Sequence, residues 1–255
     1  MSANTLQALI FDVDGTLADT ESAHLAAFNH AFAELGLGWA WDEALYTELL
    51  NISGGKERIL HYWKTAQPAL RELEAMALQD TVNRLHEIKT AAYESAVNSG
   101  AVGLRPGVLR LINEALAQGL QLAIATTTSP VNIAALLRRA MGSDWRLNFS
   151  AIGDASSAPL KKPHPQVYLQ MLAALQLSSA QCLAFEDSSN GLRAAAAAGL
   201  ATVITPTRYT AQHDFSSAMQ VLPDLSQLDL AQLRLWFEAS PRTAGVAATS
   251  ARAEH

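Results

Sequence analysis

Short apolar runs followed directly by polar residues are the feature that most constrains the fold of this chain. Four of them occur, at Leu6–Phe11, Leu120–Ala125, Cys182–Phe185 and Ala201–Ile204. Runs of this length between turn or polar residues are typical of β-strands that are buried on both faces. A sheet made of such strands needs other elements to cover it on both sides.

Amphipathic helical patterns fill the intervals between these runs. Val108, Leu111, Ile112 and Ala115 recur at spacings of i, i+3, i+4 and i+7, and a second apolar stripe with spacings of four runs over residues 167–175. Strands that alternate with helices predict βαβ units and a parallel sheet, so the expected fold class is α/β.

The alternation fails between residues 22 and 101, where no convincing strand occurs. Apolar side chains over Leu25–Leu35 mark one helix, a shorter helix is expected after Gly55, and a long helical stretch follows Pro68. This segment is therefore interpreted as an all-helical insertion after the first strand.

Glycines and a proline in residues 98–107 indicate a hinge where the chain returns from the insertion. The expected division is a core domain of residues 1–18 and 103–239 and a helical domain of residues 19–102. Residues 240–255 lack apolar periodicity, so we expect a disordered tail.

Composition excludes several classes of partner. The chain of 255 residues carries a net charge of −6 and has no basic run, which argues against nucleic-acid and membrane partners. No apolar run approaches the ~18 residues of a spanning helix, and we expect a soluble, cytoplasmic monomer. The one cysteine, Cys182, lies in an apolar run and is expected to pack in the core.

The first predicted strand ends in two carboxylates. In an open α/β sheet, ligands bind beyond the carboxyl ends of the strands, and Asp12 and Asp14 follow the first run there with Gly15 next in the chain. Two uncompensated negative charges on one face repel each other, and hard oxygen ligands suit Mg²⁺. An Asx-turn that leaves the strand is the alternative.

Three further strand ends or adjacent loops carry polar groups. The hydroxyls of residues 126–129 suit an anion at a helix start or a simple N-cap. Lys161 or Lys162 can neutralise an aspartate and a phosphate, or be solvated charge. Glu186 and Asp187 can complete a metal site or cap a helix. These alternatives stay open for each motif taken alone.

Taken together and in order, these groups over residues 6–225 resemble the four motifs of the haloacid dehalogenase superfamily, with a Rossmann-like core and an inserted helical cap. The resemblance implies that Asp12 is the nucleophile, Asp14 the general acid and base, Thr126 a phosphoryl-binding hydroxyl and Lys162 the cation that holds nucleophile and phosphate. The implied Mg²⁺ ligands are Asp12, the Asp14 carbonyl and Asp187, with Glu186 behind them or bound to the metal through a water.

The presence of Asp14 favours phosphoryl transfer, because the dehalogenases of the superfamily lack that carboxylate. The helical insertion resembles the cap of the β-phosphoglucomutase-like subgroup. Residues 12–21, His24, residues 52–58 and residues 126–129 resemble CbbY-type sugar phosphatases most. The implied substrate-binding residues are Glu21, His24, Gly54, Gly55, Lys56, Arg58, Thr127, Thr128 and Ser129.

The resemblance implies a Mg²⁺-dependent phosphatase that converts xylulose 1,5-bisphosphate to xylulose 5-phosphate through an aspartyl phosphate. Gly54 and Gly55 let backbone amides approach a second phosphate, with Lys56 and Arg58 beside it, although a solvated helix start fits the same residues. Glu21 and His24, three residues apart on a helix, can meet sugar hydroxyls or form an ordinary polar face.

Several alternatives remain. A sugar-phosphate mutase and a phosphatase for another sugar phosphate use the same motifs. A binding protein on an inactive version of the fold is disfavoured by the complete set of motif residues. On the predicted long helix, nothing local distinguishes Arg84, His86 and Lys89 from helix surface.

Overall fold

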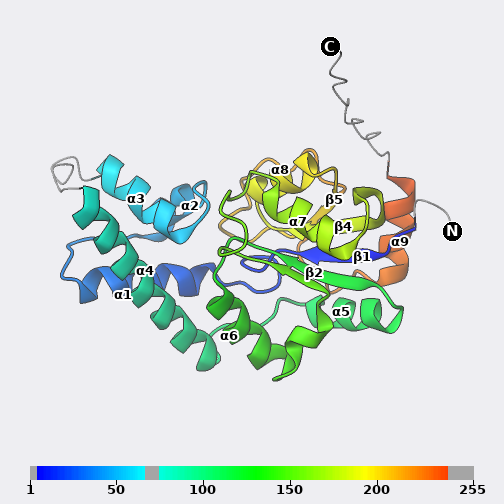
Figure 1. Cartoon of the computed structure of the whole chain (residues 1–255), viewed down its shortest axis with the longest axis horizontal. Helices are drawn as coiled ribbons and strands as arrows, with labels where there is room; N and C mark the ends of the chain where they lie inside the picture. The colour runs from blue at the N-terminus through cyan, green and yellow to red at the C-terminus, as the bar shows by residue number, and fades with distance from the viewer. Residues whose placement is uncertain (1–4, 67–74, 241–255) are drawn as a thin grey trace, which may run out of the picture.

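The computed structural model describes residues 5–66 and 75–240. Its centre is a parallel sheet with the strand order β3-β2-β1-β4-β5-β6, of which β2, β1, β4 and β5 are labelled in Figure 1. The strands are β1 (Ala8–Phe11), β2 (Gln121–Ala125), β3 (Ala151–Gly153), β4 (Cys182–Glu186), β5 (Ala201–Ile204) and β6 (Gln220–Val221). The prediction of an α/β parallel sheet is confirmed. The sequence analysis missed β3 and β6 because strands of three and two residues are too short to show a period.

Alternate residues of each strand face opposite layers of helices. In β1, Leu9 and Phe11 pack with α5, α6 and α9, whereas Ala8 and Ile10 pack with α7 and α8. These helices are α5 (Val108–Ala117), α6 (Pro130–Met141), α7 (Gln166–Leu175), α8 (Ser189–Ala197) and α9 (Leu230–Ala239), with short 3-10 turns at Trp145–Asn148 and Ser179–Gln181. Cys182 is fully buried in β4, as predicted.

The inserted segment is helical throughout its described part. It comprises α1 (Glu21–Glu34), α2 (Glu43–Leu49), α3 (Gly55–Ala66) and α4 (Ala75–Asn98), which lie together beside the sheet in Figure 1. The sequence analysis did not predict α2, because only Tyr46 and Leu49 of this short helix are buried. Ala18 and Leu104 pair as an antiparallel bridge, so the two passages of the chain between the regions lie side by side. The domain boundaries proposed from the sequence stay a prediction.

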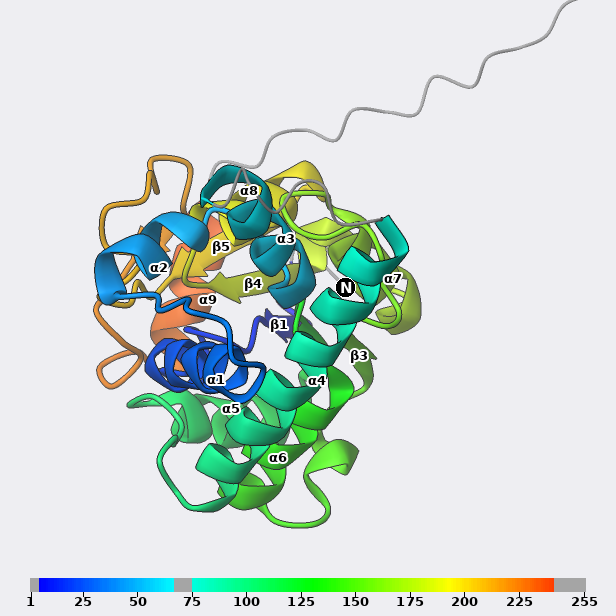
Figure 2. The ribbon, with the colours of Figure 1, turned by 90° about the vertical axis from the view of Figure 1, so that its left-hand side faces the viewer.

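An aromatic cluster forms the interior of the helical insertion. Phe28, Phe32 and Trp41 are buried in it, and their ring centroids lie 4.8 to 6.3 Å apart. Tyr209, from the loop after β5, joins the same cluster and packs edge-on against Tyr46 at 5.8 Å. The core therefore contributes a side chain to the interior of the cap. Viewed from the cap side, β1 and β4 are seen between α1, α3 and α4 (Figure 2).

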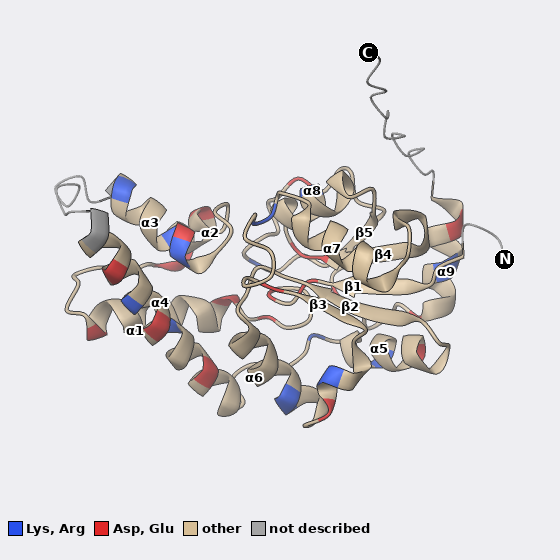
Figure 3. Ribbon diagram, viewed as in Figure 1, with Lys and Arg blue, Asp and Glu red and all other residues tan. Residues whose placement is uncertain are grey.

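The charged residues are interspersed along the cap helices, with Lys and Arg among Asp and Glu, as Figure 3 shows. Among the described residues, no helix combines the length and the apolarity that crossing a membrane requires. The tail for which we predicted disorder lies, from residue 241 onwards, outside the described residues.

Candidate active site

The site lies where the strand order reverses. From β1 the chain continues to β2 and β3 and then crosses back to β4 on the other side of β1, and ligands bind at the carboxyl ends of strands at such a point. Phe11 of β1 is in register with Phe185 of β4, and the Asp12 amide donates to the Phe185 carbonyl at 3.0 Å. Asp12 therefore lies beside Glu186 and Asp187.

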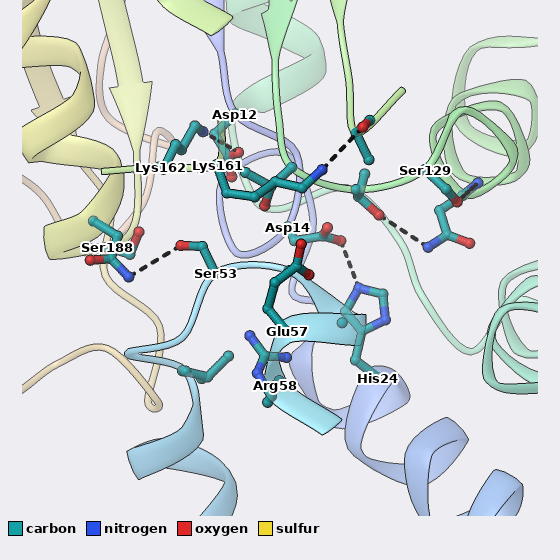
Figure 4. A pocket seen from close by; sticks show the side chains of 18 of the residues that line it. Asp12, Asp14, His24, Ser53, Glu57, Arg58, Ser129, Lys161, Lys162 and Ser188 are labelled. Carbon is teal, nitrogen blue, oxygen red and sulfur yellow. Dashed lines mark hydrogen bonds and ion pairs between the residues drawn. The ribbon is translucent and has the colours of Figure 1, made fainter. Parts of the chain in front are cut away.

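Lys162 joins the carboxylates of these two strands. Its Nζ donates to Asp12 Oδ1 at 2.7 Å, to Glu186 Oε1 at 2.6 Å and to the Ala125 carbonyl at 2.8 Å, which uses all three donors of the ammonium group (Figure 4). Burial alone would lower the pKa of Lys162, but the two carboxylates raise it above its ordinary value. Lys161 points elsewhere and donates to a backbone carbonyl at 3.1 Å. Of the two lysines, Lys162 is thus the one that contacts Asp12.

Three buried carboxylates converge beside this lysine. Asp12, Glu186 and Asp187 can each offer an oxygen so that these atoms lie within 4.8 Å of one another. Burial raises the pKa of Asp12 to about 7, with Lys162 opposing and Glu186 adding to the shift, and burial followed by repulsion from Asp12 and Glu186 raises the pKa of Asp187 well above its ordinary value. Glu186 Oε2 is buried without a hydrogen-bond partner.

One ammonium group does not balance this much buried negative charge. A divalent cation with a preference for hard oxygen ligands fits both the donor set and the unpartnered oxygen of Glu186. The carboxylate of Asp14 is not part of the group, which agrees with its predicted contribution through the backbone carbonyl.

Two glycines make room for these carboxylates. Gly15 has a left-handed φ of 80°, and a Cβ there would lie 2.2 Å from Asp187 Oδ2. A Cβ at Gly191 would lie 1.8 Å from Glu186 Oε2. Both positions exclude a side chain, because the backbone packs directly against a candidate metal ligand.

Asp14 is held by a chain of side chains that runs into the cap. Thr20 Oγ1 donates to Asp14 Oδ1 at 2.8 Å, and His24 Nε2 lies 2.9 Å from the same oxygen. On the other side of the ring, Lys89 Nζ lies 2.8 Å from His24 Nδ1. An ammonium group can only donate, so Nδ1 accepts and His24 donates to Asp14 from Nε2.

The charges along this chain support one another. Burial would raise the pKa of Asp14, but the neighbouring His24 lowers it most, and Thr20 and the charge of Lys89 add to the shift, so that it lies well below its ordinary value. Burial lowers the pKa of Lys89 to about 8, with the charge of Asp14 opposing the shift. Lys89 Nζ also lies 5.0 Å from the ring centroid of Phe28, which stabilises a buried cation.

The sequence analysis missed Lys89, although a signal exists. Val82, Leu85, Lys89, Tyr93 and Val97 lie on one stripe of α4, and all five are buried. A lysine in a stripe that is otherwise apolar indicates a buried cation with a partner.

The cap residues proposed for substrate binding all line the same cavity, and their present partners differ. Glu21 accepts from Tyr46 OH at 2.6 Å. Arg58 donates from Nη1 to Tyr46 OH at 3.3 Å and from Nε and Nη2 to two backbone carbonyls of the cap. Lys56 is exposed and donates to Asn83 Oδ1 at 2.8 Å. The exposed Glu57 points into the cavity in Figure 4, and its carboxylate lies against Gly54.

The loop after β2, residues 126–129, both lines the cavity and caps α6. Thr127, Thr128 and Ser129 line the cavity, whereas Thr126 is buried behind them and accepts from the Thr128 amide at 3.2 Å. Ser129 is also the N-cap of α6, since its side chain accepts from the Asn132 amide at 3.4 Å. The capping alternative therefore holds for Ser129 without excluding a role in binding. Ser188 caps α8 in the same way.

The cavity that these groups enclose has a volume of about 400 Å³. Its core side carries Asp12, Glu186, Asp187 and Lys162, and its cap side carries basic residues together with Glu21 and Glu57. The basic residues that line it besides Lys162 are His24, Lys56, Arg58, His86, Lys89, Lys161 and His213. Three residues of α4 could not be distinguished from helix surface in the sequence. Of these, His86 and Lys89 line the cavity, whereas Arg84 is exposed and pairs with Glu87.

A family model described as haloacid dehalogenase-like hydrolase matches residues 6–199. The chain belongs to this family. The match confirms the predicted superfamily and, with the relatives below, the predicted class of phosphoric monoester hydrolase.

The CbbY proteins are among its relatives. The plasmid-encoded protein CbbY of Cupriavidus necator is 52% identical over 91% of this chain and 96% of its own length. A crystal structure of a CbbY variant from Rhodobacter sphaeroides with xylulose 1,5-bisphosphate has a TM-score of 0.83 and 39% identity, and covers 90% of this chain and 99% of that one. β-Phosphoglucomutase from Clostridium difficile shares the fold, with a TM-score of 0.74 at 22% identity over 92% and 98% of the two chains.

Proposed function

We propose that this protein is a Mg²⁺-dependent phosphatase that hydrolyses the 1-phosphate of xylulose 1,5-bisphosphate to give xylulose 5-phosphate. The observation that carries the proposal is the polarity of the cavity, with Asp12, Lys162 and the candidate metal site on one side and Lys56 and Arg58 on the other. A bisphosphate has one phosphate for each side. The CbbY structure with xylulose 1,5-bisphosphate supports this substrate.

In the first half-reaction, a carboxylate oxygen of Asp12 attacks phosphorus and the bond from phosphorus to the sugar oxygen breaks. Lys162 holds Asp12 in place, because its ammonium group is fixed by three acceptors from three strands or strand ends. The negative charge of the bound substrate raises the pKa of Asp14, which His24 and Thr20 lower in its absence, so that Asp14 takes up a proton. Asp14 gives this proton to the leaving oxygen, and the product on the enzyme is an aspartyl phosphate.

In the second half-reaction, water attacks the same phosphorus and the bond to Asp12 breaks. Asp14 takes the proton of this water, and His24 and Thr20 orient it because both donate to Oδ1. The hydrogen bond between Lys89 and His24 sets the tautomer that makes this donation possible. The cap side chains of His24 and Lys89 therefore contribute to catalysis by orienting Asp14.

The acidic group of Asp12, Glu186 and Asp187 would hold Mg²⁺, with the Asp14 carbonyl as a further ligand. When bound, Mg²⁺ offsets the negative charge of the phosphoryl oxygens. Thr127 and Thr128 are proposed to bind the transferring phosphoryl group from the end of β2, with amides and hydroxyls that Ser129 and α6 fix in place. Thr126, which is buried behind them, would contribute by holding the Thr128 amide.

The distal phosphate is proposed to lie against Gly54, Gly55, Lys56 and Arg58. Lys56 is exposed, so it can exchange its hydrogen bond to Asn83 for one to a phosphate oxygen. Arg58 stacks on the rings of Phe28 and Tyr46, which keeps the guanidinium at the cavity.

The test compares two substrates in a variant with Lys56→Gln and Arg58→Gln. Turnover of the bisphosphate should fall, since each lost charge-assisted contact costs about 1.5–3 kcal/mol, or roughly ten- to a hundredfold in kcat/KM. Hydrolysis of a small aryl phosphate should change little, because it has no second anion. Free phosphate and isomerised sugar phosphate are both followed, which separates hydrolysis from mutase activity.

Arg84→Gln is the matched control, since it removes an exposed basic side chain of the cap that does not line the cavity. Thermal unfolding of the double variant checks that the loss of the Arg58 hydrogen bonds has not opened the cap. Equal losses on both substrates, or none on the bisphosphate, would remove the distal phosphate site and leave a sugar phosphatase of other specificity.

A further inference from the structure

Arg105 lies outside the cavity, in the segment that returns from the cap to the core. Its backbone amide donates to the Leu17 carbonyl at 2.8 Å, next to the bridge between Ala18 and Leu104. None of the chemistry proposed above uses this side chain. Its guanidinium nevertheless points toward the loops at the end of the sheet where the site lies.

The guanidinium contacts five acceptors in three loops. Nη1 donates to the Gly15 carbonyl, to the Thr205 carbonyl at 2.5 Å and to Thr205 Oγ1 at 3.2 Å. Nη2 donates to the Pro206 carbonyl at 3.0 Å and to the Pro223 carbonyl at 2.9 Å. A rigid planar group with several donors can hold acceptors from separate loops in one geometry, which a single ammonium group cannot do.

Two of these loops lead directly to the candidate metal ligands. Gly15 follows Asp14 in the chain, and its Cα packs so closely on Asp187 that a Cβ would lie 2.2 Å from Oδ2. On the other side, the amide of Thr205 donates to the Glu186 carbonyl at 2.8 Å. Arg105 is thus linked through Gly15 to the loop after β1 and through Thr205 to the end of β4, and these two segments supply the carboxylates.

We propose that Arg105 is a positioning residue for the metal site. By holding Gly15 against Thr205, it fixes the separation of the loop after β1 from the end of β4, and with it the convergence of Asp12, Glu186 and Asp187. The inference rests on the proposed metal site and is independent of the proposed substrate.

Arg110 offers a matched comparison, because it makes the same kind of contact elsewhere. Its guanidinium donates to the Leu225 carbonyl at 2.9 Å and the Leu228 carbonyl at 2.6 Å, and pairs with Glu114 at 2.6 Å. Neither of those segments carries a candidate metal ligand. If Arg105 only stabilised the core, the loss of either guanidinium would change the stability and the Kd for Mg²⁺ in the same way.

The test measures Mg²⁺ binding by calorimetry, without substrate, in the whole protein and in the variants Arg105→Lys and Arg110→Lys. Both variants keep the charge and lose the planar set of donors. The Kd for Mg²⁺ should rise about tenfold in Arg105→Lys, as for changes in groups that orient metal ligands, and stay within about twofold in Arg110→Lys. Thermal unfolding without metal should show comparable losses of stability in the two.

Thr205→Val is a milder variant that removes one of the five acceptors and keeps the shape of the side chain. It should raise the Kd by about two- to threefold. An unchanged Kd in folded Arg105→Lys would overturn the inference, as would an equal rise in Arg110→Lys. If Arg105→Lys does not fold, an unchanged Kd in Thr205→Val overturns it instead. Absence of Mg²⁺ binding in the unmodified protein would remove the metal site as well, whereas failure to hydrolyse the bisphosphate would leave the inference intact.

Discussion

The core and the cap bring their side chains to the cavity in different ways. In the core, Asp12, Lys162 and Asp187 lie at or near strand ends that the backbone hydrogen bonds of the sheet hold together. In the cap, His24 and Lys89 are separated by 65 residues and meet only because α1 packs on α4 through side chains. Core positions therefore follow from topology, and cap positions follow from packing.

This difference has a functional counterpart. In the proposed reaction, the core groups would surround the phosphorus that reacts, which every substrate has, whereas most of the cap groups would face the remainder of the substrate. Changes in the core should thus affect all substrates alike, and changes in the cap should discriminate among them. His24 and Lys89 are exceptions, because they belong to the cap and act on Asp14.

The largest effect is expected for Asp12→Asn. The amide has nearly the volume of the carboxylate but is a poor nucleophile, so kcat should fall about 10⁴-fold or more on an aryl phosphate and on the bisphosphate. Steady-state rates and mass spectrometry for the aspartyl phosphate provide the measurement. The fold should be retained, as shown by thermal unfolding. Substantial residual activity, once deamidation is excluded, would end the covalent mechanism.

Asp187→Asn should act on the metal. Losing one charged ligand of a hard-oxygen site should raise the Mg²⁺ concentration for half-maximal activity at least about 100-fold, with activity partly recovered at high metal concentration. Activity against Mg²⁺ concentration is the measurement, with Asp144→Asn as a control at an exposed aspartate that does not line the cavity. An unchanged titration would transfer the ligand role to Glu186.

These two core residues were predictable from the sequence for a physical reason. Parallel strands end at one edge of the sheet, so polar residues at the ends of apolar runs must meet there, whatever the details of packing. The residues alone left the choice between Lys161 and Lys162 open, because neighbouring residues in a loop differ only in direction, and the assignment to Lys162 came from the family resemblance. The contacts of Lys162 with Asp12 and Glu186 make that distinction in the structure.

The cap was less predictable. Its helices were recognised from their apolar stripes, but the partner of each polar side chain depends on how the helices cross. Lys89 could have been detected as a charge within an apolar stripe, whereas Tyr209 could not, since it reaches the cap cluster from a loop after β5. Arg105 likewise acts through tertiary contacts to backbone carbonyls, which leave no pattern in the sequence.

Lys89→Met tests a cap residue that is expected to affect all substrates alike. The variant keeps an unbranched side chain in the buried stripe and removes the donor that fixes His24, so Asp14 loses its orientation. We expect kcat to fall about 30-fold on both substrates, below the full contribution of acid–base catalysis, which is about 10²–10⁴-fold. His86→Gln is the comparison, because it changes another cavity residue of α4 and should alter the bisphosphate only. A loss confined to the bisphosphate in Lys89→Met would place Lys89 in substrate binding instead.

The smallest effect concerns Tyr209, which reaches from the core into the cap interior. Tyr209→Phe keeps the ring that packs against Tyr46 and removes the hydroxyl, which lies 3.2 Å from Ser22 Oγ and accepts from Arg208 Nη2 at 2.9 Å. The lost hydrogen bonds lie at the edge of the interface, so they should contribute about 1 kcal/mol to cap closure, or roughly a threefold to fivefold rise in KM. If the hydroxyl acts on closure of the cap, the rise in KM should be equal for the two substrates, because the cap closes over either of them.

Tyr209→Leu should give a larger rise in KM, since the aromatic cluster then loses a ring. If Tyr209→Phe raised the KM of the bisphosphate alone, the hydroxyl would act on the substrate. Discrimination among substrates would then belong to the cap and also to the core loop that carries Tyr209.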